Sequence, residues 1–189
     1  MCCRYSVLPG SEKAKAIVTM LDRLYPDTPY KTGEIFPGDT APGVIDRGGR
    51  ILPVPAVFGF PGFQDGRPLI NARAETAAEK RAFAESVKER RIILPATGFY
   101  EWGRDSAKTK YLFTADAMSV LYLCGLFRII DGQYRFVILT RQANASMAAT
   151  HDRMPVIVGA EQVRPYLTDL TAAAEILATA APALERQPA

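Results

Sequence analysis

The chain has 189 residues, of which 48% are hydrophobic and 23% are charged, and its formal net charge is +3. These values fit one globular domain with its own core, and no apolar run approaches the roughly 20 residues that a membrane-spanning helix needs. Three cysteines, Cys2, Cys3 and Cys124, are too few for a disulfide framework, so we expect a cytoplasmic protein with reduced thiols and no signal peptide.

The first third of the chain predicts one helix, one loop and one irregular strand. Residues 11–24 carry apolar side chains at helical spacing, with Ser11 as the candidate cap. Residues 26–42 are rich in Pro, Gly and Thr and are predicted to be a loop. Residues 50–60 (RILPVPAVFGF) predict a strand, and their prolines favour an edge position in a sheet.

A second helix is predicted at residues 76–90. Thr76 and Glu79 match the T-x-x-E capping box, and Phe83 with Val87 marks a buried stripe. Four β-like runs follow this helix, at residues 91–102, 110–116, 119–130 and 134–140.

The last two of these runs are separated by Asp131 and Gly132, a strong hairpin signal. MPVIVG adds another strand, and the tail 161–189 has helical propensity. No repeat or linker divides the chain. We therefore expect a single α+β domain over 1–189, with a curled, barrel-like, antiparallel-rich sheet and a few short helices.

Four short stretches stand out as candidates for chemistry. Cys2 follows the initiator methionine, and INARAET holds Asn71 and Arg73 beside Glu75. GFYEW holds Glu101, and HDRMP holds His151, which is the only histidine of the chain. Each has a structural alternative, in the same order: an incidental cysteine at a disordered terminus, a tied helix start, an outward strand residue and a structural histidine.

Glu101 is the least ordinary of these side chains. Strand alternation places it on the same face as the apolar Phe99, and a buried carboxylate must be paired or neutral, as suits a general acid or base. Cys124 lies in an apolar strand and is read as a small core residue. One histidine and a vicinal cysteine pair give no metal-site spacing, so no metal and no cofactor are expected.

An N-terminal cysteine offers chemistry that internal cysteines lack. Removal of Met1 would leave Cys2 with an α-amine beside its thiol, and α-amines have a pKa of about 7.7–8.0. Such an amine forms an imine with an aldehyde, and the thiol can then close a thiazolidine ring. The predicted target is therefore an aldehyde.

The four motifs MC-x-R, NAR-x-E, GFYEW and H-x-RMP occur in this order over about residues 1–158. The set resembles the SOS response-associated peptidase (SRAP) family, whose members sense abasic sites in single-stranded DNA and crosslink to them. The resemblance implies that Cys2 is the nucleophile, that Asn71 holds Cys2 and the sugar, and that Glu101 shuttles protons. The resemblance also implies that His151 aids opening of the sugar ring and β-elimination.

The resemblance also implies the DNA contacts. Arg4 and Arg73 would contact phosphates, while Phe58 and Phe63 occupy places where many members carry tryptophans. Residue 3, commonly glycine in the family, is Cys3 here. The partner would be single-stranded DNA with abasic sites, and the protein a cytoplasmic monomer that joins the nucleoid when bound to DNA. Family members also remove the residues before the cysteine, as a peptidase, and carry lyase-type chemistry.

Two other functions remain open at this stage. The chain could be a DNA-independent thiol peptidase or amidohydrolase that uses Cys2 as an N-terminal nucleophile or pairs Cys2 with His151. It could also be a non-catalytic module that binds single-stranded DNA.

Overall fold

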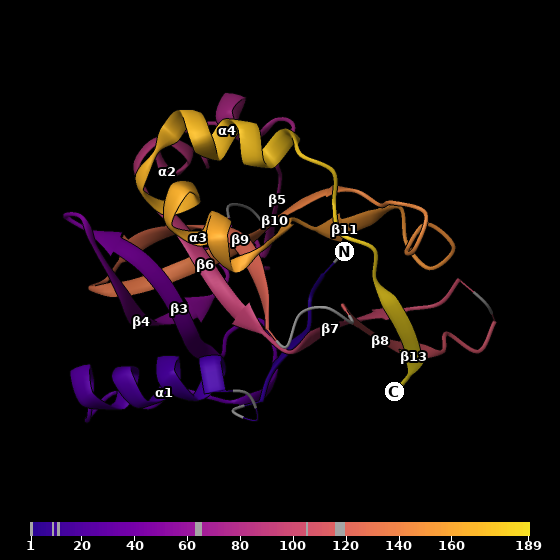
Figure 1. Ribbon diagram of the computed structural model, residues 1–189, viewed down its shortest axis with the longest axis horizontal. Helices are drawn as coiled ribbons and strands as arrows, with labels where there is room; N and C mark the ends of the chain where they lie inside the picture. The colour runs from indigo at the N-terminus through magenta and orange to yellow at the C-terminus, as the bar shows by residue number, and fades with distance from the viewer. Residues whose placement is uncertain (1, 9, 11, 63–65, 105, 116–119) are drawn as a thin grey trace.

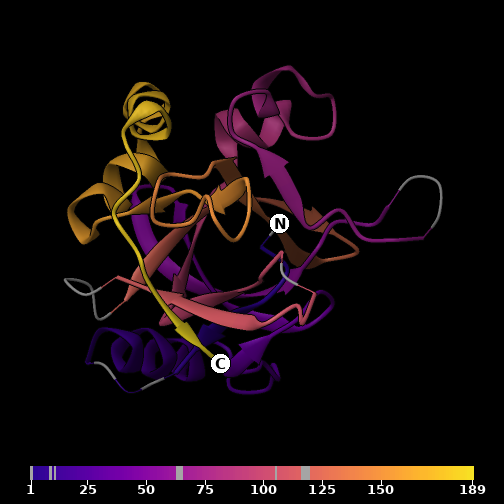
Figure 2. The ribbon, with the colours of Figure 1, turned by 90° about the vertical axis from the view of Figure 1, so that its right-hand side faces the viewer.

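The computed structural model describes residues 2–8, 10, 12–62, 66–104, 106–115 and 120–189 (Figure 1). The candidate cap Ser11 and the candidate DNA contact Phe63 lie outside these residues. The described chain folds as a strand barrel, a second sheet beside it, and helices on two opposite sides (Figures 1 and 2). None of the described helices is long and apolar enough to span a membrane.

Five strands close into the barrel that the sequence predicts. They are β3 (Thr40–Arg47), β4 (Arg50–Phe58), β6 (Arg91–Ala96), β9 (Leu121–Ile130) and β10 (Gln133–Gln142). Each pairs with its neighbour in the order β10-β4-β3-β6-β9, and β9 pairs again with β10. The β4–β10 pairing is parallel and the others are antiparallel. Asp131 and Gly132 both have positive φ, at 51° and 75°, as the predicted hairpin turn requires.

The start of the chain forms an interior strand of the second sheet. Its order is β13-β8-β7-β1-β2. The strands are β1 (Tyr5–Val7), β2 (Gly33–Ile35), β7 (Gly98–Trp102), β8 (Lys110–Thr114) and β13 (Glu185–Pro188). Because β1 pairs with β2 on one edge and with β7 on the other, the backbone that follows Cys2 is fixed from both sides.

Three short strands finish the barrel at the end of β10. These are β5 (Asn71–Arg73), β11 (Arg153–Pro155) and β12 (Ile157–Val158). β5 continues the edge that β4 occupies, while β11 pairs with the end of β10 and β12 pairs with β9. The motif residues of NAR-x-E and H-x-RMP therefore flank one strand end.

The predicted first helix is confirmed as α1 (Glu12–Leu24), and the predicted helical tail in part as α3 (Ala160–Thr168) and α4 (Leu170–Ala178). In both views α1 lies on one side of the barrel and α3 and α4 on the opposite side. Two expectations are wrong. The tail ends in β13, and the predicted loop 26–42 contains β2 and the start of β3.

The predicted edge position of the proline-rich strand is also wrong. β4 is a strand of the barrel wall and is paired on both edges, with β3 and with β10. Phe58 exchanges backbone hydrogen bonds with Gly38 and Asp39 on the β3 side. Since successive residues point to alternate edges, Pro53 and Pro55 turn their missing N–H groups to the other edge, where β10 pairs only from Ala56 onward. The two prolines therefore remove no backbone hydrogen bond between β4 and β3.

The predicted helix 76–90 is broken. A 3₁₀ turn covers Ala77–Glu79, and α2 covers only Ala84–Glu89. Thr76 makes no side-chain capping bond, so the predicted capping box does not form. Next to the break, Phe83 packs against Phe60, with ring centroids 6.2 Å apart.

Candidate site at the N-terminal cysteine

Cys2 is buried at the point where the two sheets meet. Its side chain is 1% exposed, and its Sγ lies 4.0 Å from the Arg4 carbonyl oxygen. Asn71, at the start of β5, donates from Nδ2 to the Cys2 carbonyl oxygen at 3.2 Å. The structure thus brings together two candidate residues separated by 69 positions. The Asn71 Oδ1 atom is buried and has no hydrogen-bond partner among the described residues.

Glu101 faces the same interior. Phe99 and Glu101 are 0% and 4% exposed, which confirms the predicted shared face of β7. The backbone N–H of Tyr100 donates to the Arg4 carbonyl at 2.9 Å, so β7 runs directly beside the first residues. Burial raises the pKa of the Cys2 thiol, and the negative charge of Glu101 acts in the same direction. The Glu101 carboxylate is therefore close enough to act electrostatically on the thiol.

His151 lies in the turn before β11 and is partly buried. Its Nδ1 accepts a hydrogen bond from the backbone N–H of Arg153 at 2.9 Å, and the Asp152 carboxylate lies at the same distance. The backbone amide donates to Nδ1 while the carboxylate can only accept, so this side of the ring is held between a donor and an acceptor. Asp152 also lies 3.8 Å from Arg104, three residues after Glu101, and this ion pair links the histidine turn to the end of β7.

The amino-acid sequence indicated no role for Arg153, yet this residue holds the histidine turn in place. Its guanidinium forms two hydrogen bonds with the Glu75 carboxylate, at 2.8 and 2.7 Å, and one with the Thr140 carbonyl at 2.6 Å. Hydrogen bonding to Arg153 lowers the pKa of Glu75 to about 2. The sequence did contain a signal for this ion pair, since Glu75 and Arg153 are the last charged positions of the NAR-x-E and H-x-RMP motifs.

Arg4 is held between two aromatic rings. Its guanidinium carbon lies 4.2 Å from the Phe36 ring centroid and 4.8 Å from that of Trp102. Glu34 lies 3.6 Å from Arg4 and 2.6 Å from Lys110. Stacking of this kind immobilises a guanidinium, and nothing in the linear sequence indicated these partners because they come from separate strands.

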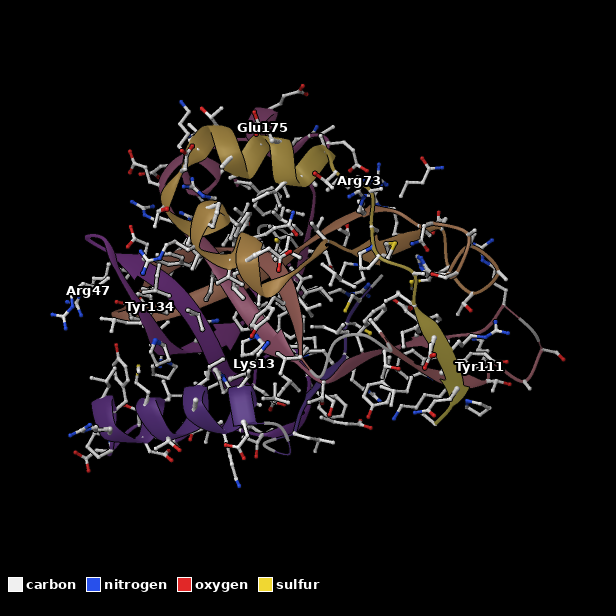
Figure 3. The ribbon with its side chains drawn as sticks, in the orientation of Figure 1. Lys13, Arg47, Arg73, Tyr111, Tyr134 and Glu175 are labelled. Carbon is white, nitrogen blue, oxygen red and sulfur yellow. The ribbon has the colours of Figure 1, made fainter. Side chains whose placement is uncertain are left out.

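Arg73 is exposed at the end of β5. Figure 3 shows it far from Arg47 and Tyr134, which lie together at the opposite end of the barrel. The structure therefore places Arg73 on the same strand as Asn71, with its side chain open to solvent.

Phe58 does not occupy the position expected of a DNA contact. It is 1% exposed and stacks on Phe136, with ring centroids 4.9 Å apart and planes 2° apart. Tyr5 packs edge-on against it at 6.0 Å. The ring belongs to the core because β4 turns it inward, and it supports the strand that follows Cys2. Cys124 is 0% exposed, as predicted for a core residue.

The chain is similar to several known proteins. The family described as "SOS response associated peptidase (SRAP)" matches residues 1–188. The chain is 28% identical over 179 residues to the "abasic site processing protein YedK" of Escherichia coli (strain K12), covering 88% of this chain and 79% of that protein. It is 37% identical over 109 residues to the "abasic site processing protein YobE" of Bacillus subtilis (strain 168), covering 54% and 50%.

Solved structures share the fold. A protein from Bordetella bronchiseptica superposes with a TM-score of 0.78 at 20% identity, covering 100% of this chain and 99% of that one. A phage-related protein from the same organism gives 0.76 at 24% identity, covering 100% and 94%. With the family match extending over nearly every residue, the chain belongs to the SOS response-associated peptidase (SRAP) family.

Proposed function

We propose that this protein senses abasic sites in single-stranded DNA and bonds to them covalently through Cys2. The observation that carries the proposal is the grouping of Cys2, Asn71 and Glu101 at one buried point. Relatives named abasic site processing proteins support the choice of substrate. We also propose that the protein is a monomer located in the cytoplasm.

The chemistry requires that Met1 is removed, which frees the α-amine of Cys2. The open-chain sugar of an abasic site presents an aldehyde carbon. The amine attacks this carbon, a C–N bond forms, and the carbonyl oxygen leaves as water to give an imine. The thiol then adds to the imine carbon, its proton passes to nitrogen, and a thiazolidine ring closes. The net product is protein plus DNA minus one water.

Three side chains support these steps. Asn71 fixes the backbone of Cys2 through its hydrogen bond to the carbonyl, so the amine is presented in one orientation. Glu101, close to a thiol that burial keeps protonated, is placed to accept the thiol proton as the ring closes. His151, whose ring is held by the Arg153 amide, donates a proton to the sugar ring oxygen during opening and aids β-elimination.

Arg73 would contact a phosphate beside the lesion, since its guanidinium is exposed next to Asn71. Arg4 would do so from its aromatic sandwich, where stacking already restricts its rotamers. Phosphate contacts position the strand without reading sequence, which suits a lesion that has no base. Self-processing peptidase and lyase activities belong to the same proposal.

A thiol peptidase is the less favoured function. Such enzymes need a thiolate, and their cysteines have lowered pKa values. Here burial and the neighbouring Glu101 charge both raise the pKa of the Cys2 thiol. That environment suits a thiol that reacts second, after the amine.

Two variants test the proposal, both assayed after Met1 removal with an oligonucleotide containing one abasic site. Cys2→Ala should form no stable adduct and keep noncovalent binding to single-stranded DNA. Cys2→Ser retains the amine, so borohydride should trap an imine although no heat-stable adduct accumulates. A stable adduct with Cys2→Ala would contradict the proposed nucleophile, and binding without any adduct by the unmutated protein would favour the non-catalytic module.

A further inference from the structure

The turn that carries His151 contacts a distant part of the chain. This histidine turn, residues 143–152, joins β10 to β11, and within it the His151 N–H donates to the carbonyl of the buried Met147 at 3.1 Å. Residues 179–186, here called the C-terminal segment, run past the turn from the end of α4 into β13 (Figure 2). Contacts between the turn and this segment therefore bear on where His151 lies.

Asn144 makes the central contact between them. Its Nδ2 donates to two carbonyl oxygens of the C-terminal segment, Pro182 at 2.8 Å and Ala181 at 3.3 Å. Its Oδ1 accepts from the Ser146 hydroxyl at 2.6 Å, and that hydroxyl oxygen accepts from the Leu184 N–H at 3.1 Å. One amide therefore bonds to the segment through its nitrogen and to the turn through its oxygen, which requires a side chain with both a donor and an acceptor.

Arg186 makes a second contact, to the residue before the histidine. Its Nη1 donates to the hydroxyl of the buried Thr150 at 3.2 Å. Its guanidinium carbon also lies 4.5 Å from the ring centroid of Tyr111, and Tyr111 is opposite Glu101 in the β7–β8 register. Arg186 therefore connects the histidine turn to the strand pair that carries Glu101.

The C-terminal segment is itself fixed at both ends. Residues 185–188 pair with β8, and the Thr179 carbonyl accepts a hydrogen bond from Arg141 of β10. Between these points Leu184 is buried in the core that lies under both sheets. The segment therefore offers the histidine turn a fixed support.

We propose that Asn144 and Arg186 are positioning residues, which hold His151 in place for sugar opening by fixing its turn to the C-terminal segment. The inference rests on the proposed function, in which His151 acts on the sugar. A proton donor must lie about 2.6–3.2 Å from the atom that it serves, so a small displacement of the turn slows ring opening. Attack by the amine and ring closure by the thiol do not use His151 and should not depend on these contacts.

Proton NMR of the free protein tests the positioning directly, because His151 is the only histidine of the chain and its imidazole signals are unambiguous. The unmutated protein should give one sharp set of signals. In Asn144→Ala they should broaden or split, since the ring samples more than one position. Arg141→Ala, which removes a bond to the same segment at the far end from the turn, should keep them sharp.

Arg186→Ala alters an exposed residue and should broaden the same signals. It is matched to Arg141→Ala, since both remove one guanidinium that bonds to another part of the chain. This variant decides the question where Asn144→Ala does not fold. Signals as sharp as those of Arg141→Ala would overturn the assignment.

Crosslinking to two aldehydes separates positioning of His151 from general damage to the site. One oligonucleotide carries a natural abasic site, and the other carries an aldehyde without the hydroxyl that closes the sugar ring, so it needs no opening step. Asn144→Ala should slow adduct formation roughly 10-fold with the first and less than about 2-fold with the second. It should add no further loss to His151→Ala, because both changes affect the same step.

Equal slowing of Asn144→Ala with both aldehydes would mean that the contact supports the site only in general, and the assignment would be wrong. Unmutated protein that reacts with neither aldehyde would count against the proposed function instead. The NMR comparison needs no DNA, so it tests the positioning of His151 in either case.

Discussion

Glu75 and Arg153 join two motifs across the end of β10 through a two-point ion pair, with N–O distances of 2.8 and 2.7 Å. Glu75 follows the strand that carries Asn71, and the backbone N–H of Arg153 orients His151. The Gln142 N–H also donates to Glu75, at 3.2 Å. One carboxylate therefore fixes the relative positions of three chain segments around the site.

Glu75→Gln should lower the free energy of unfolding by about 0.5–1 kcal/mol, since the Glu75 side chain is 48% exposed and solvent screens the pair. The pKa of Glu75 falls from 4.5 to about 2 on folding. A lowered folded-state pKa means that its contribution is full above pH 4.5 and is lost as the pH falls towards 2. Urea denaturation across this range, with the exposed Glu79→Gln as control, measures the effect. A difference that does not shrink at low pH would contradict it.

Glu101→Gln should slow crosslinking by about 10²- to 10⁴-fold, the usual contribution of a positioned acid or base. The amide keeps the volume of the buried side chain but cannot accept the thiol proton. Rates of adduct formation on denaturing gels, with affinity for an unreactive analogue as control, separate chemistry from binding. Unchanged rates in the folded variant would remove Glu101 from the mechanism.

Asn71→Ala should reduce crosslinking by about 10- to 100-fold, because the Cys2 carbonyl loses the hydrogen bond from Asn71 and the amine is no longer held in one orientation. Asn71→Asp is the sharper variant, since its carboxylate has nearly the same shape but cannot donate to the Cys2 carbonyl. Both should show similar losses in single-turnover rate. Normal crosslinking by Asn71→Asp would mean that the hydrogen bond is not needed.

Phe58→Ala should lower the free energy of unfolding by about 3–5 kcal/mol, as expected when a buried aromatic ring is removed from a stacked pair. A surface ring that contacts DNA would instead change affinity and leave stability nearly intact. Chemical denaturation and analogue binding by the folded fraction distinguish the two roles. Full stability with impaired binding would return Phe58 to the DNA interface.

Local pattern predicted much of the fold. Strand alternation was enough to place Phe99 and Glu101 on one buried face, and the Asp131–Gly132 turn followed from its need for positive φ. Helical spacing likewise indicated α1. Each of these features depends on neighbours within a few residues, which is the range over which sequence periodicity carries information.

The incorrect sequence predictions share a different cause. The break at Lys80 accompanies a contact between Phe83 and Phe60, and residues 185–188 form β13 by pairing with β8. The sandwich around Arg4 draws its rings from β7 and from the chain after β2. All are long-range contacts, and no local pattern encodes the partner. The motifs indicated the site residues, while only the fold showed that Glu75 and Arg153 connect them.

Intact mass spectrometry of the protein, before and after incubation with an oligonucleotide that carries one abasic site, tests the central claim most directly. The account predicts loss of Met1 and a heat-stable species whose mass equals the mature protein plus the DNA minus one water. Cys2→Ala should give no such species. Mature protein that binds the oligonucleotide but forms no adduct would contradict Cys2 as an aldehyde-trapping residue.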